Sequence, residues 1–593
     1  MRLWFGTVAA AALAFSLQAP LAAQTPSPDQ DQAILSDVID QFWAYTLAHN
    51  PVLASSIGID SYAGQVGDYS LAEADRQAAQ AKLFLDRLGM VHTDALDEEG
   101  KVNLAILKRM LGEQVEANGY GQRVVNFTSY SSWHQNFAGM ASNSPFANAA
   151  DYRSYTDRLA LFPQINAQSI AVANQAISGG FTQPCVTLTG YEGTITGLIT
   201  EDPKDSRFYE PFTRPRPSTI SAADYAKLAA DAATVIREKV FPALQKERDW
   251  YVTDYAPACA REPGVSSQPG GADYYAFRIR QETTTEMTAD EIHKLGLKEV
   301  ARIRTEMEKV AKDAGYDSRE AFIAHLRTDP QYYATTPQQL MEKSALQAKT
   351  IDGKLPSLFG RLPRLPYGLK QIPAETAEGT TTAYYSPGSP EIGVSGTYYV
   401  NTSKLDQRPF WEIPALTSHE AVPGHHLQIA LQQELDMPEF RKQLAFFTAF
   451  VEGWGLYSER LGIEMGLYDT PAKDMGRLSY EMWRASRLVV DTGIHSKGWS
   501  KEKAVAFMTD NTALSAANID AEVNRYISWP GQALAYKIGE LKIRELRGRA
   551  EKKLGEKFDL RAFHDVVLGQ GAVPLDLLEQ RVDSWIAEQE AAK

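Results

Sequence analysis

The chain has 593 residues and is acidic, with 60 lysine and arginine residues against 74 aspartate and glutamate residues and a net charge of −14. An acidic chain without basic runs argues against a nucleic acid as a partner. Its hydrophobic content of 44% supplies more than one ordinary core, so we expect a mainly α-helical protein of two packed lobes.

Residues 1–23 have the features of a secretory signal: Arg2, an apolar run over 8–17, and Leu21-Ala22-Ala23 before Gln24. The segment is too short for a membrane anchor, and no later stretch holds about 18 consecutive apolar residues. No cysteine follows the apolar run, which argues against lipid attachment there. We therefore expect an exported protein, periplasmic or secreted, without an integral membrane segment after signal removal.

Apolar residues recur mostly at helical spacing over residues 31–178, which predicts a series of packing helices. Glycine, threonine and proline become frequent over 179–217 and again over 256–272, as is typical of loops. A helix is expected between these loops, over 222–247.

The lobe boundary is placed where this loop-rich part ends, giving an amino-terminal helical lobe over 24–275 and a carboxy-terminal lobe over 276–593, to which the candidate zinc-binding and catalytic residues described below belong. The two cysteines, Cys185 and Cys259, both lie in the first lobe. In an oxidising compartment they can form one disulfide, and two free buried thiols are the alternative.

The second lobe begins with Thr288-Ala289-Asp290-Glu291, a capping box that predicts a helix to about residue 314. Residues 351–402 are rich in proline, glycine, tyrosine and threonine and predict short strands. Beside a metal site, an exposed strand can pair with a substrate backbone, and 396–402 is the candidate, with Tyr398 and Tyr399 as substrate-binding residues. A small structural hairpin with its tyrosines in the core is the alternative.

Residues 418–428, SHEAVPGHHLQ, concentrate three of the ten histidines of the chain beside a carboxylate. Imidazole nitrogen and carboxylate oxygen are ligands that zinc takes, and hydrolytic sites combine three protein ligands with one open position. Glu420 directly follows His419, which is the usual position of the base that deprotonates the attacking water. The stretch predicts a zinc site, and a helix start that carries surface histidines is the alternative.

The spacing differs from the common H-E-x-x-H pattern because Pro423 occupies the position of the second histidine. On an ideal helix, at roughly 100° per residue, neither His425 nor His426 shares a metal with His419. Pro423 disfavours helical dihedrals before it and Gly424 tolerates unusual ones, so we expect the helix to bulge or break. We assign His425 as the second ligand and keep His426 as the alternative ligand or a neighbouring group.

The third ligand is expected from the downstream segment FVEGWGLYSE. Residues 444–457 are apolar nearly all round, which predicts a buried helix. A buried carboxylate needs compensation and zinc provides it, so Glu452 is the predicted ligand; pairing with Arg484 or Arg487 is the alternative. Glu459, two turns further on, lies on the same face and can orient a zinc-bound histidine.

A polar stripe follows on the next predicted helix, where residues recur at three- and four-residue steps: Arg484, Arg487, Asp491 and His495. Such a stripe can line a cleft. His495 can then donate to an oxyanion, Asp491 can fix the tautomer of His495, and Arg487 can bind a substrate carboxylate. A solvated or salt-bridged helix face is the alternative.

Four segments together, HEAVPGHHLQ, FVEGWGLYSE, RLVVDTGIH and PGQALAYKIG, resemble the bacterial domain-of-unknown-function family 885. The HE…GH and FVE elements are also similar to the gluzincin metallopeptidases, the clan of thimet oligopeptidase and angiotensin-converting enzyme. This resemblance implies His419, His425 and Glu452 as zinc ligands and Glu420 as the base. It also implies a two-lobed helical fold with a small β element beside the metal helix.

The gluzincin resemblance further implies a tyrosine hydroxyl as oxyanion donor, which Tyr526 or Tyr536 can supply. Arg525, next to Tyr526, is a further candidate for substrate binding. Tyrosines that simply pack in a helical core are the alternative.

We therefore predict an exported zinc-dependent metallohydrolase, a peptidase that cleaves short peptides with Glu420 as general base and Zn²⁺ as cofactor. An amidase acting on a small metabolite and a non-catalytic metal-binding envelope protein are the alternatives. The sequence holds no phosphate-binding loop, dinucleotide-binding glycine motif or serine-nucleophile elbow, which excludes those function classes.

Overall fold

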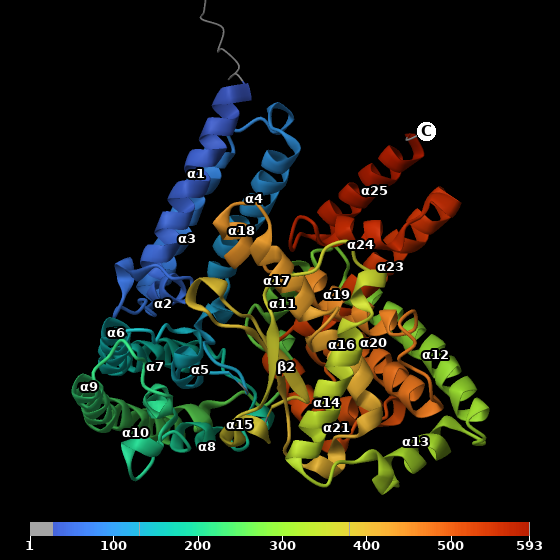
Figure 1. Ribbon diagram of the computed structural model, residues 1–593. Coiled ribbons are helices and arrows are strands. Elements are labelled where there is room, and N and C mark those ends of the chain that lie inside the picture. The colour runs from blue at the N-terminus through green and yellow to red at the C-terminus, as the bar shows by residue number, and fades with distance from the viewer. Residues whose placement is uncertain (1–27, 130, 379, 592–593) are drawn as a thin grey trace, which may run out of the picture.

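The computed structural model describes residues 28–129, 131–378 and 380–591 and shows a mainly helical protein with one small sheet (Figure 1). The predicted fold class, mainly α with few strands, is confirmed. The predicted signal segment, 1–23, lies outside the described residues. Within the described ranges, no helix combines the length and the apolar character needed to cross a membrane.

Helices account for most of the first half of the described chain, and several begin at a side-chain cap. Ser70, Asp97 and Asn148 each accept a hydrogen bond from a backbone N–H of the turn that follows. The helix expected over 222–247 is present as α9 and α10, joined by a π-helical turn. The helices are α1 (Pro28–His49), α2 (Pro51–Ser56), α3 (Leu71–Leu88), α4 (Glu98–Asn118), α5 (Trp133–Gly139), α6 (Ala149–Ala160), α7 (Phe162–Gly179), α8 (Tyr191–Thr196), α9 (Ala222–Val235), α10 (Phe241–Trp250) and α11 (Gly271–Thr283).

The second half begins at the predicted capping box, in which Thr288 and Glu291 bond reciprocally at the start of α12. The helices are α12 (Ala289–Asp313), α13 (Arg319–Thr328), α14 (Pro337–Asp352), α15 (Ala374–Ala377), α16 (Ile413–Glu420), α17 (His425–Glu434), α18 (Glu439–Gln443), α19 (Thr448–Leu461), α20 (Pro471–Lys497), α21 (Lys501–Asn511), α22 (Ala516–Ser528), α23 (Ala535–Leu554), α24 (Leu560–Leu568) and α25 (Leu575–Ala591). The strands are β1 (Tyr367–Gln371), β2 (Ala383–Ser386) and β3 (Gly396–Val400).

The three strands form one sheet in the order β1-β3-β2, with β3 parallel to β1 and antiparallel to β2. The segment predicted to pair with a substrate, 396–402, therefore provides the central strand. Its backbone groups already bond to a strand on either side, so it offers no free edge to a peptide. This part of the prediction is wrong, because strand order depends on pairing between distant segments that the sequence pattern does not reveal.

Of the two largest hydrophobic cores in the described residues, one crosses the lobe boundary expected from the sequence. It joins residues from 35–111 to residues from 265–586, whereas the other contains residues from 127–255. Helices α1, α3 and α4 thus share a core with the carboxy-terminal half, while α5 to α10 form a separate body (Figure 1). Position 275 lies inside α11, so the chain does not divide there.

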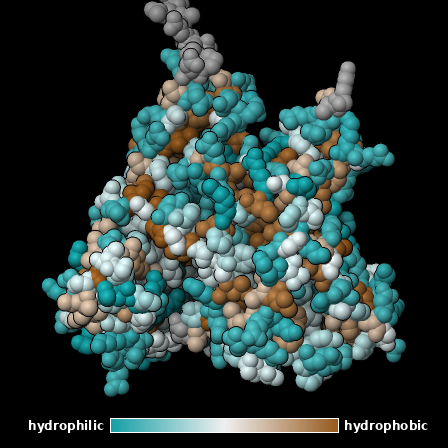
Figure 2. All heavy atoms as spheres, viewed as in Figure 1, coloured by the Kyte–Doolittle hydropathy of each residue, from teal (hydrophilic) through white to brown (hydrophobic). Residues whose placement is uncertain are grey.

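A disulfide joins Cys185 to Cys259, so of the two states that the sequence left open the structure has the bonded one. The bridge lies beside the core of 127–255, against which Cys259 packs. On the face shown in Figure 2, hydrophilic residues cover most of the surface, with smaller apolar patches between them, as expected for a chain with 23% charged residues.

Candidate metal centre

The predicted break in the metal segment is present between α16, which ends at Glu420, and α17, which begins at His425. The Val422–Pro423 peptide is cis, and Gly424 lies where a Cβ atom would stand 1.9 Å from the carbonyl oxygen of His419. Only glycine therefore lets the chain pass this close to the end of α16. The turn brings the ring of His425 to 4.7 Å from the ring of His419.

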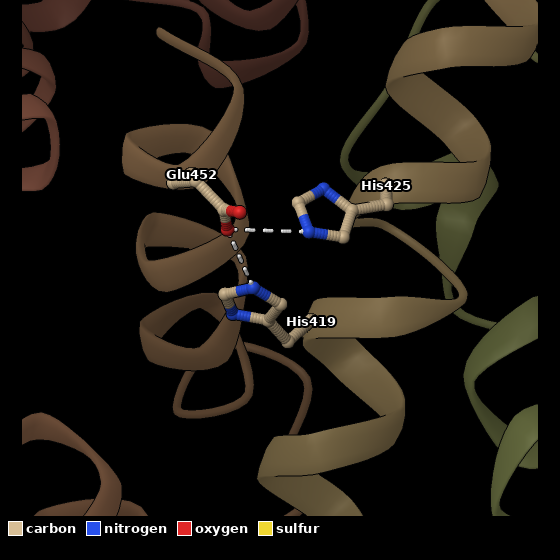
Figure 3. Close-up of side chains that lie close together, drawn as sticks. All are labelled: His419, His425 and Glu452. Carbon is tan, nitrogen blue, oxygen red and sulfur yellow. Dashed lines mark hydrogen bonds and ion pairs between the residues drawn. The ribbon is translucent and has the colours of Figure 1, made fainter. Parts of the chain in front are cut away.

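Glu452 approaches both histidines from α19, as Figure 3 shows. Its Oε2 atom lies 3.2 Å from Nε2 of His419 and 3.3 Å from Nε2 of His425. One ligand atom from each of the three residues lies within 4.8 Å of the others. The Glu452 side chain is 13% exposed, so the predicted burial is nearly complete but leaves access from solvent.

Close packing of three helices holds this arrangement. A Cβ atom on Gly455 of α19 would lie 2.7 Å from the ring of His419. A Cβ atom on Gly539 of α23 would lie 1.8 Å from the carbonyl oxygen of Ala449, so α19 and α23 meet backbone to backbone. The indole of Trp454 donates a hydrogen bond of 2.8 Å to the carbonyl of Pro423, which ties α19 to the turn between the histidines.

Glu459 lies behind His419, as predicted from its position two turns after Glu452. Its carboxylate accepts a hydrogen bond of 2.8 Å from Nδ1 of His419 and pairs with Arg484 at 3.1 Å. Burial alone would lower the pKa of His419, but hydrogen bonds to Glu452 and Glu459 outweigh it and raise that pKa to about 9. Burial would raise the pKa of Glu452, but the neighbouring His425 and His419 hold it well below its usual range.

The donor set fits zinc. Two imidazole nitrogens converge on one carboxylate oxygen, and three protein ligands leave one coordination position open. Nδ1 of His425 is buried and has no hydrogen-bond partner within the described part of the chain. Within these residues, the outer nitrogen of His425 therefore lacks the kind of hydrogen bond that Nδ1 of His419 makes to Glu459.

Glu420 is the last residue of α16 and is 9% exposed. Its charge contributes to the raised pKa values of both His419 and Tyr398. Glu420 is therefore within electrostatic range of the candidate ligand His419, which it follows directly in the chain.

His426 lies outside the ligand group. Its Nδ1 accepts a hydrogen bond of 2.9 Å from the hydroxyl of Tyr385, and its Nε2 donates one of 3.0 Å to the carbonyl of Leu365. Both ring nitrogens are therefore engaged, and burial lowers the pKa of the ring to about 4. The alternative ligand is thereby excluded: His426 anchors α17 to the sheet while His425 faces Glu452.

Comparison of the sequence with known protein families assigns the chain to one of them. The sequence model of the family described as "Bacterial protein of unknown function (DUF885)" matches residues 51–582. The chain belongs to this family. No curated protein matches it.

Two of the solved structures that match this family member share its fold. One, described as a "putative lipoprotein" from Colwellia psychrerythraea, is 28% identical, with a TM-score of 0.86 over 95% of this chain and 100% of that chain. The other, described as a "putative lipoprotein of unknown function" from Shewanella oneidensis, is 18% identical, with a TM-score of 0.69 over 92% of this chain and 99% of that chain. These descriptions name no reaction, ligand or substrate for either protein.

The polar stripe of α20 does not line a cleft in this DUF885 protein. His495 is fully buried: its Nδ1 accepts a hydrogen bond from the backbone N–H of Val265, and its Nε2 donates one to the carbonyl of Tyr526. Asp491 accepts hydrogen bonds from the hydroxyl of Tyr275 and the backbone N–H of Gly531. The predicted roles of His495 as oxyanion donor and Asp491 as its partner are therefore wrong, because these groups hold other elements against α20.

Of the two candidate tyrosines, Tyr536 lies at the metal centre. Its ring stacks on that of His419 with 6.2 Å between centroids and 22° between planes, and its hydroxyl accepts a hydrogen bond of 2.8 Å from Arg525. The hydroxyl of Tyr526 is instead buried and accepts hydrogen bonds from Trp483 and Arg487. Tyr526 is therefore corrected to a structural residue.

Of the remaining residues predicted to bind substrate, two tyrosines lie in the sheet and two arginines lie near Tyr536. Tyr398 is fully buried, with its hydroxyl 3.5 Å from that of Thr417, and Tyr399 stacks on Tyr384 of the neighbouring strand. Burial thus favours the packing alternative for Tyr398, whereas Tyr399 is half-buried in the central strand. Arg487 and Arg525 both pack against Tyr536, at the metal centre.

Three contacts of the site were not predicted from the sequence: those made by Arg484, Trp454 and Tyr385. Arg484 was expected to pair with Glu452 or to belong to a polar stripe lining a cleft, whereas it pairs with Glu459. The clustering of glycine and tryptophan in FVEGWG was the available signal for a close helix contact, since glycine permits the approach that the indole then fixes.

Proposed function

We propose that this protein is an exported zinc-dependent metallohydrolase that cleaves short peptides. The observation that supports it is the convergence of His419, His425 and Glu452 on one point, with Glu420 directly after His419 at the end of α16. A buried trio of two imidazoles and a carboxylate with an adjacent acid is the composition of a hydrolytic zinc site.

Zinc and Glu420 have separate roles in the proposed hydrolysis of an amide bond. Zinc, when bound, polarises the substrate carbonyl and lowers the pKa of the attacking water. Glu420 accepts the proton of that water as its oxygen attacks the carbonyl carbon, and then delivers the proton to the nitrogen that leaves as an amine.

Tyr536 is positioned to stabilise the negative charge that develops on the carbonyl oxygen. Its hydroxyl accepts hydrogen bonds from Arg525 at 2.8 Å and from Gln532 at 3.4 Å. Because both neighbours donate to the hydroxyl, its own proton is left for a further acceptor.

The finer parts of the proposal are a two-lobed gluzincin-like arrangement and export to the periplasm or beyond the cell. The first is supported by the order of the ligands, HE and GH on two consecutive helices and a glutamate on a later helix. The second is supported by the signal-like residues 1–23, by the disulfide and by the descriptions of the two similar structures as lipoproteins.

The test combines zinc content per chain with digestion of a mixed peptide library, before and after chelation. For Glu420→Gln we expect zinc to be retained and the rate to fall at least a hundredfold, because the ligands remain while the base is lost. His419→Ala should lose both zinc and activity. Glu439→Gln, an exposed change on α18, is the matched control.

Three results would count against the proposal. A protein that cleaves non-peptide amides but no peptide is an amidase of a small metabolite. A protein that binds zinc but shows no chelator-sensitive hydrolysis is a metal-binding envelope protein. A protein that binds no zinc at all contradicts the assignment of the ligands.

A further inference from the structure

Two arginines that are far apart in the sequence meet at one loop of the carboxy-terminal half. Arg441 lies in α18 and Arg581 in α25, and the loop at 569–574 joins α24 to α25. Nη2 of Arg441 donates a hydrogen bond to the carbonyl of Gln570. Nη2 of Arg581 lies 2.9 Å from the position that a Cβ atom on Gly569 would take. The two guanidinium groups therefore lie beside adjacent residues of this loop.

Neither arginine is paired with an acid. Within the described residues, neither guanidinium forms an ion pair with a carboxylate. Burial lowers the pKa of Arg441 to about 10, and the charge of the exposed Glu99 opposes this effect. Burial also lowers the pKa of Arg581 to about 10, and the positive charge of Arg441 lowers it further. Two cations that repel each other thus lie close together in a position with little access to water.

Each guanidinium also has a buried N–H group without an acceptor. Arg441 is 2% exposed, and its Nε has no hydrogen-bond partner in the part of the chain that the structure describes. Nη1 of Arg581 is likewise buried and has no partner among these residues. An unpaired charged donor is unfavourable in a buried position, so both groups call for an acceptor.

Other contacts hold Arg441 and the loop in place. Nη1 of Arg441 donates a hydrogen bond of 3.0 Å to Asn103 of α4. The side chain of Gln432 in α17 donates to the carbonyl of Arg441 at 3.0 Å and accepts from the backbone N–H of Ala572 at 2.7 Å. Arg581 is only partly buried, so a small ligand can reach the two guanidinium groups from solvent. The position is therefore both prearranged and accessible.

We propose that Arg441 and Arg581 bind a phosphate group beside the loop that joins α24 to α25. A phosphate monoester carries a charge of about −1.5 to −2 at pH 7 and three strong acceptor oxygens, so one such group balances two guanidinium groups. A carboxylate has a single charge and would leave one arginine uncompensated. The phosphate group can belong to a soluble anion or to a lipid head group. The site shares no residue with the metal centre and does not depend on the proposed hydrolysis.

Titration calorimetry with inorganic phosphate, in a buffer free of other oxyanions, tests the site. We expect the wild type to bind one phosphate per chain. Arg581→Gln should weaken binding at least about tenfold, because a charge and its hydrogen bonds are lost. Arg581→Lys should keep part of the affinity, since the charge remains without the planar fork. Arg76→Gln, which removes a 60% exposed arginine of α3, should bind as the wild type does.

Vesicles distinguish the two sources of the phosphate group. The protein is sedimented with vesicles of phosphatidylcholine alone or with added phosphatidic acid, whose head group is a phosphate monoester. Retention by phosphatidic acid that Arg581→Gln abolishes and Arg76→Gln does not assigns the site to a lipid. Binding of inorganic phosphate without retention assigns it to a soluble anion. Failure to bind phosphate in either form, or binding that is equal in Arg581→Gln and the wild type, overturns the proposal.

Thermal unfolding separates binding from a structural role of Arg581. A ligand that binds only the folded chain raises its Tm, so phosphate should raise the Tm of the wild type but not that of Arg581→Met. Without phosphate, Arg581→Met should have a higher Tm than the wild type, because an apolar side chain replaces one of two repelling cations. A lower Tm that still rises with phosphate as in the wild type would show that Arg581 only supports the fold, and would overturn the proposal.

Discussion

Gly424 allows α16 and α17, which carry the candidate ligands His419 and His425, to meet. A methyl group at this position would lie 1.9 Å from the carbonyl oxygen of His419 and 2.5 Å from that of Ser418. We therefore expect Gly424→Ala to push α17 away from α16, to separate His425 from Glu452, and to lower zinc content at least tenfold. Inductively coupled plasma mass spectrometry of the purified chain measures this.

The matched control is Gly112→Ala on α4, where an added methyl group meets nothing within 4 Å. In a helix interior this change should raise the free energy of unfolding by ~0.5–1 kcal/mol and leave zinc unchanged. Full zinc occupancy in Gly424→Ala would contradict the role assigned to the turn.

His564 gives a pH-dependent contribution to stability. Its Nδ1 donates to the carbonyl of Leu358, its Nε2 accepts from the hydroxyl of Tyr457, and burial lowers its pKa to about 3. The unfolded chain, with a histidine pKa of about 6.5, binds a proton that the folded chain does not. Stability from this group is therefore complete above pH 6.5 and is lost as the pH falls toward 3, by roughly 2 kcal/mol at pH 5.

A glutamine can replace both hydrogen bonds of His564 but does not titrate. We expect His564→Gln to be less stable than the wild type at pH 7.5, and the difference in unfolding free energy to shrink by roughly 2 kcal/mol at pH 5. Urea unfolding at the two pH values measures it. A difference that stays constant between them would show that the histidine is not held neutral.

At the residue scale, local motifs in the sequence predicted candidate ligands that the structure brings together. Helix periodicity did not predict which side chains are exposed to solvent. His419, Glu420 and Glu452 follow from such motifs, and the break at Gly424 follows from its backbone. The stripe ending at His495 was found at the correct spacing, but spacing does not tell whether a face meets solvent or another helix. Most residues of α20 are buried, so its polar groups bond to other elements.

Among the elements, the pair α19 and α23 determines where Glu452 and Tyr536 stand relative to each other. A methyl group on Gly539 would lie 1.8 Å from the carbonyl of Ala449, about one helical turn before Glu452. We expect Gly539→Ala to lower the free energy of unfolding by ~2–4 kcal/mol, because two backbones in contact must separate. Thermal and urea unfolding measure the change.

The same helix provides the control. An added methyl group on Gly548 meets nothing within 4 Å, so Gly548→Ala should stabilise α23 by ~0.5–1 kcal/mol through helix propensity alone. If both variants shift stability in the same direction, the close contact between α19 and α23 does not contribute as argued.

The sheet shows the limit of prediction at this scale. Short strands were expected over 351–402 and are present, but the position of β3 between β1 and β2 depends on pairing across gaps in the sequence. The central strand β3 is mostly buried and the edge strands are more exposed, yet all three contain tyrosine, so their composition does not distinguish them. Composition therefore predicted the strands but not their order.

For the whole molecule, the sequence suggested two consecutive lobes, whereas the cores join distant parts of the chain. Arg441, almost fully buried before α19, donates a hydrogen bond of 3.0 Å to Asn103 of α4. The backbone N–H of Leu575 donates to the side chain of Thr284, at the end of α11. Apolar periodicity identifies a helix that must pack against another segment, but not which distant segment packs against it. The sequence pattern therefore could not show which helices on either side of residue 275 share a core.

The disulfide acts on the part of the molecule that has its own core. It closes a loop of 74 residues between Cys185 and Cys259, and closing a loop of this length removes unfolded-chain entropy worth ~4 kcal/mol. We expect the double variant Cys185→Ser, Cys259→Ser to unfold at a lower temperature, and a reductant to have the same effect on the wild type but none on the variant. Calorimetry in both redox conditions measures this.

Zinc content should respond differently from stability in that variant. His419, His425 and Glu452 belong to the carboxy-terminal half, while the bridge stabilises the core of 127–255. The folded variant should therefore keep one zinc per chain. One link between the two is Gln183, whose side chain donates to the carbonyl of Phe127 at 2.7 Å and reaches that of Ser528, at the end of α22, at 3.5 Å. Loss of zinc together with the bridge would mean that this link, rather than the packing of α16, α17 and α19, maintains the metal centre.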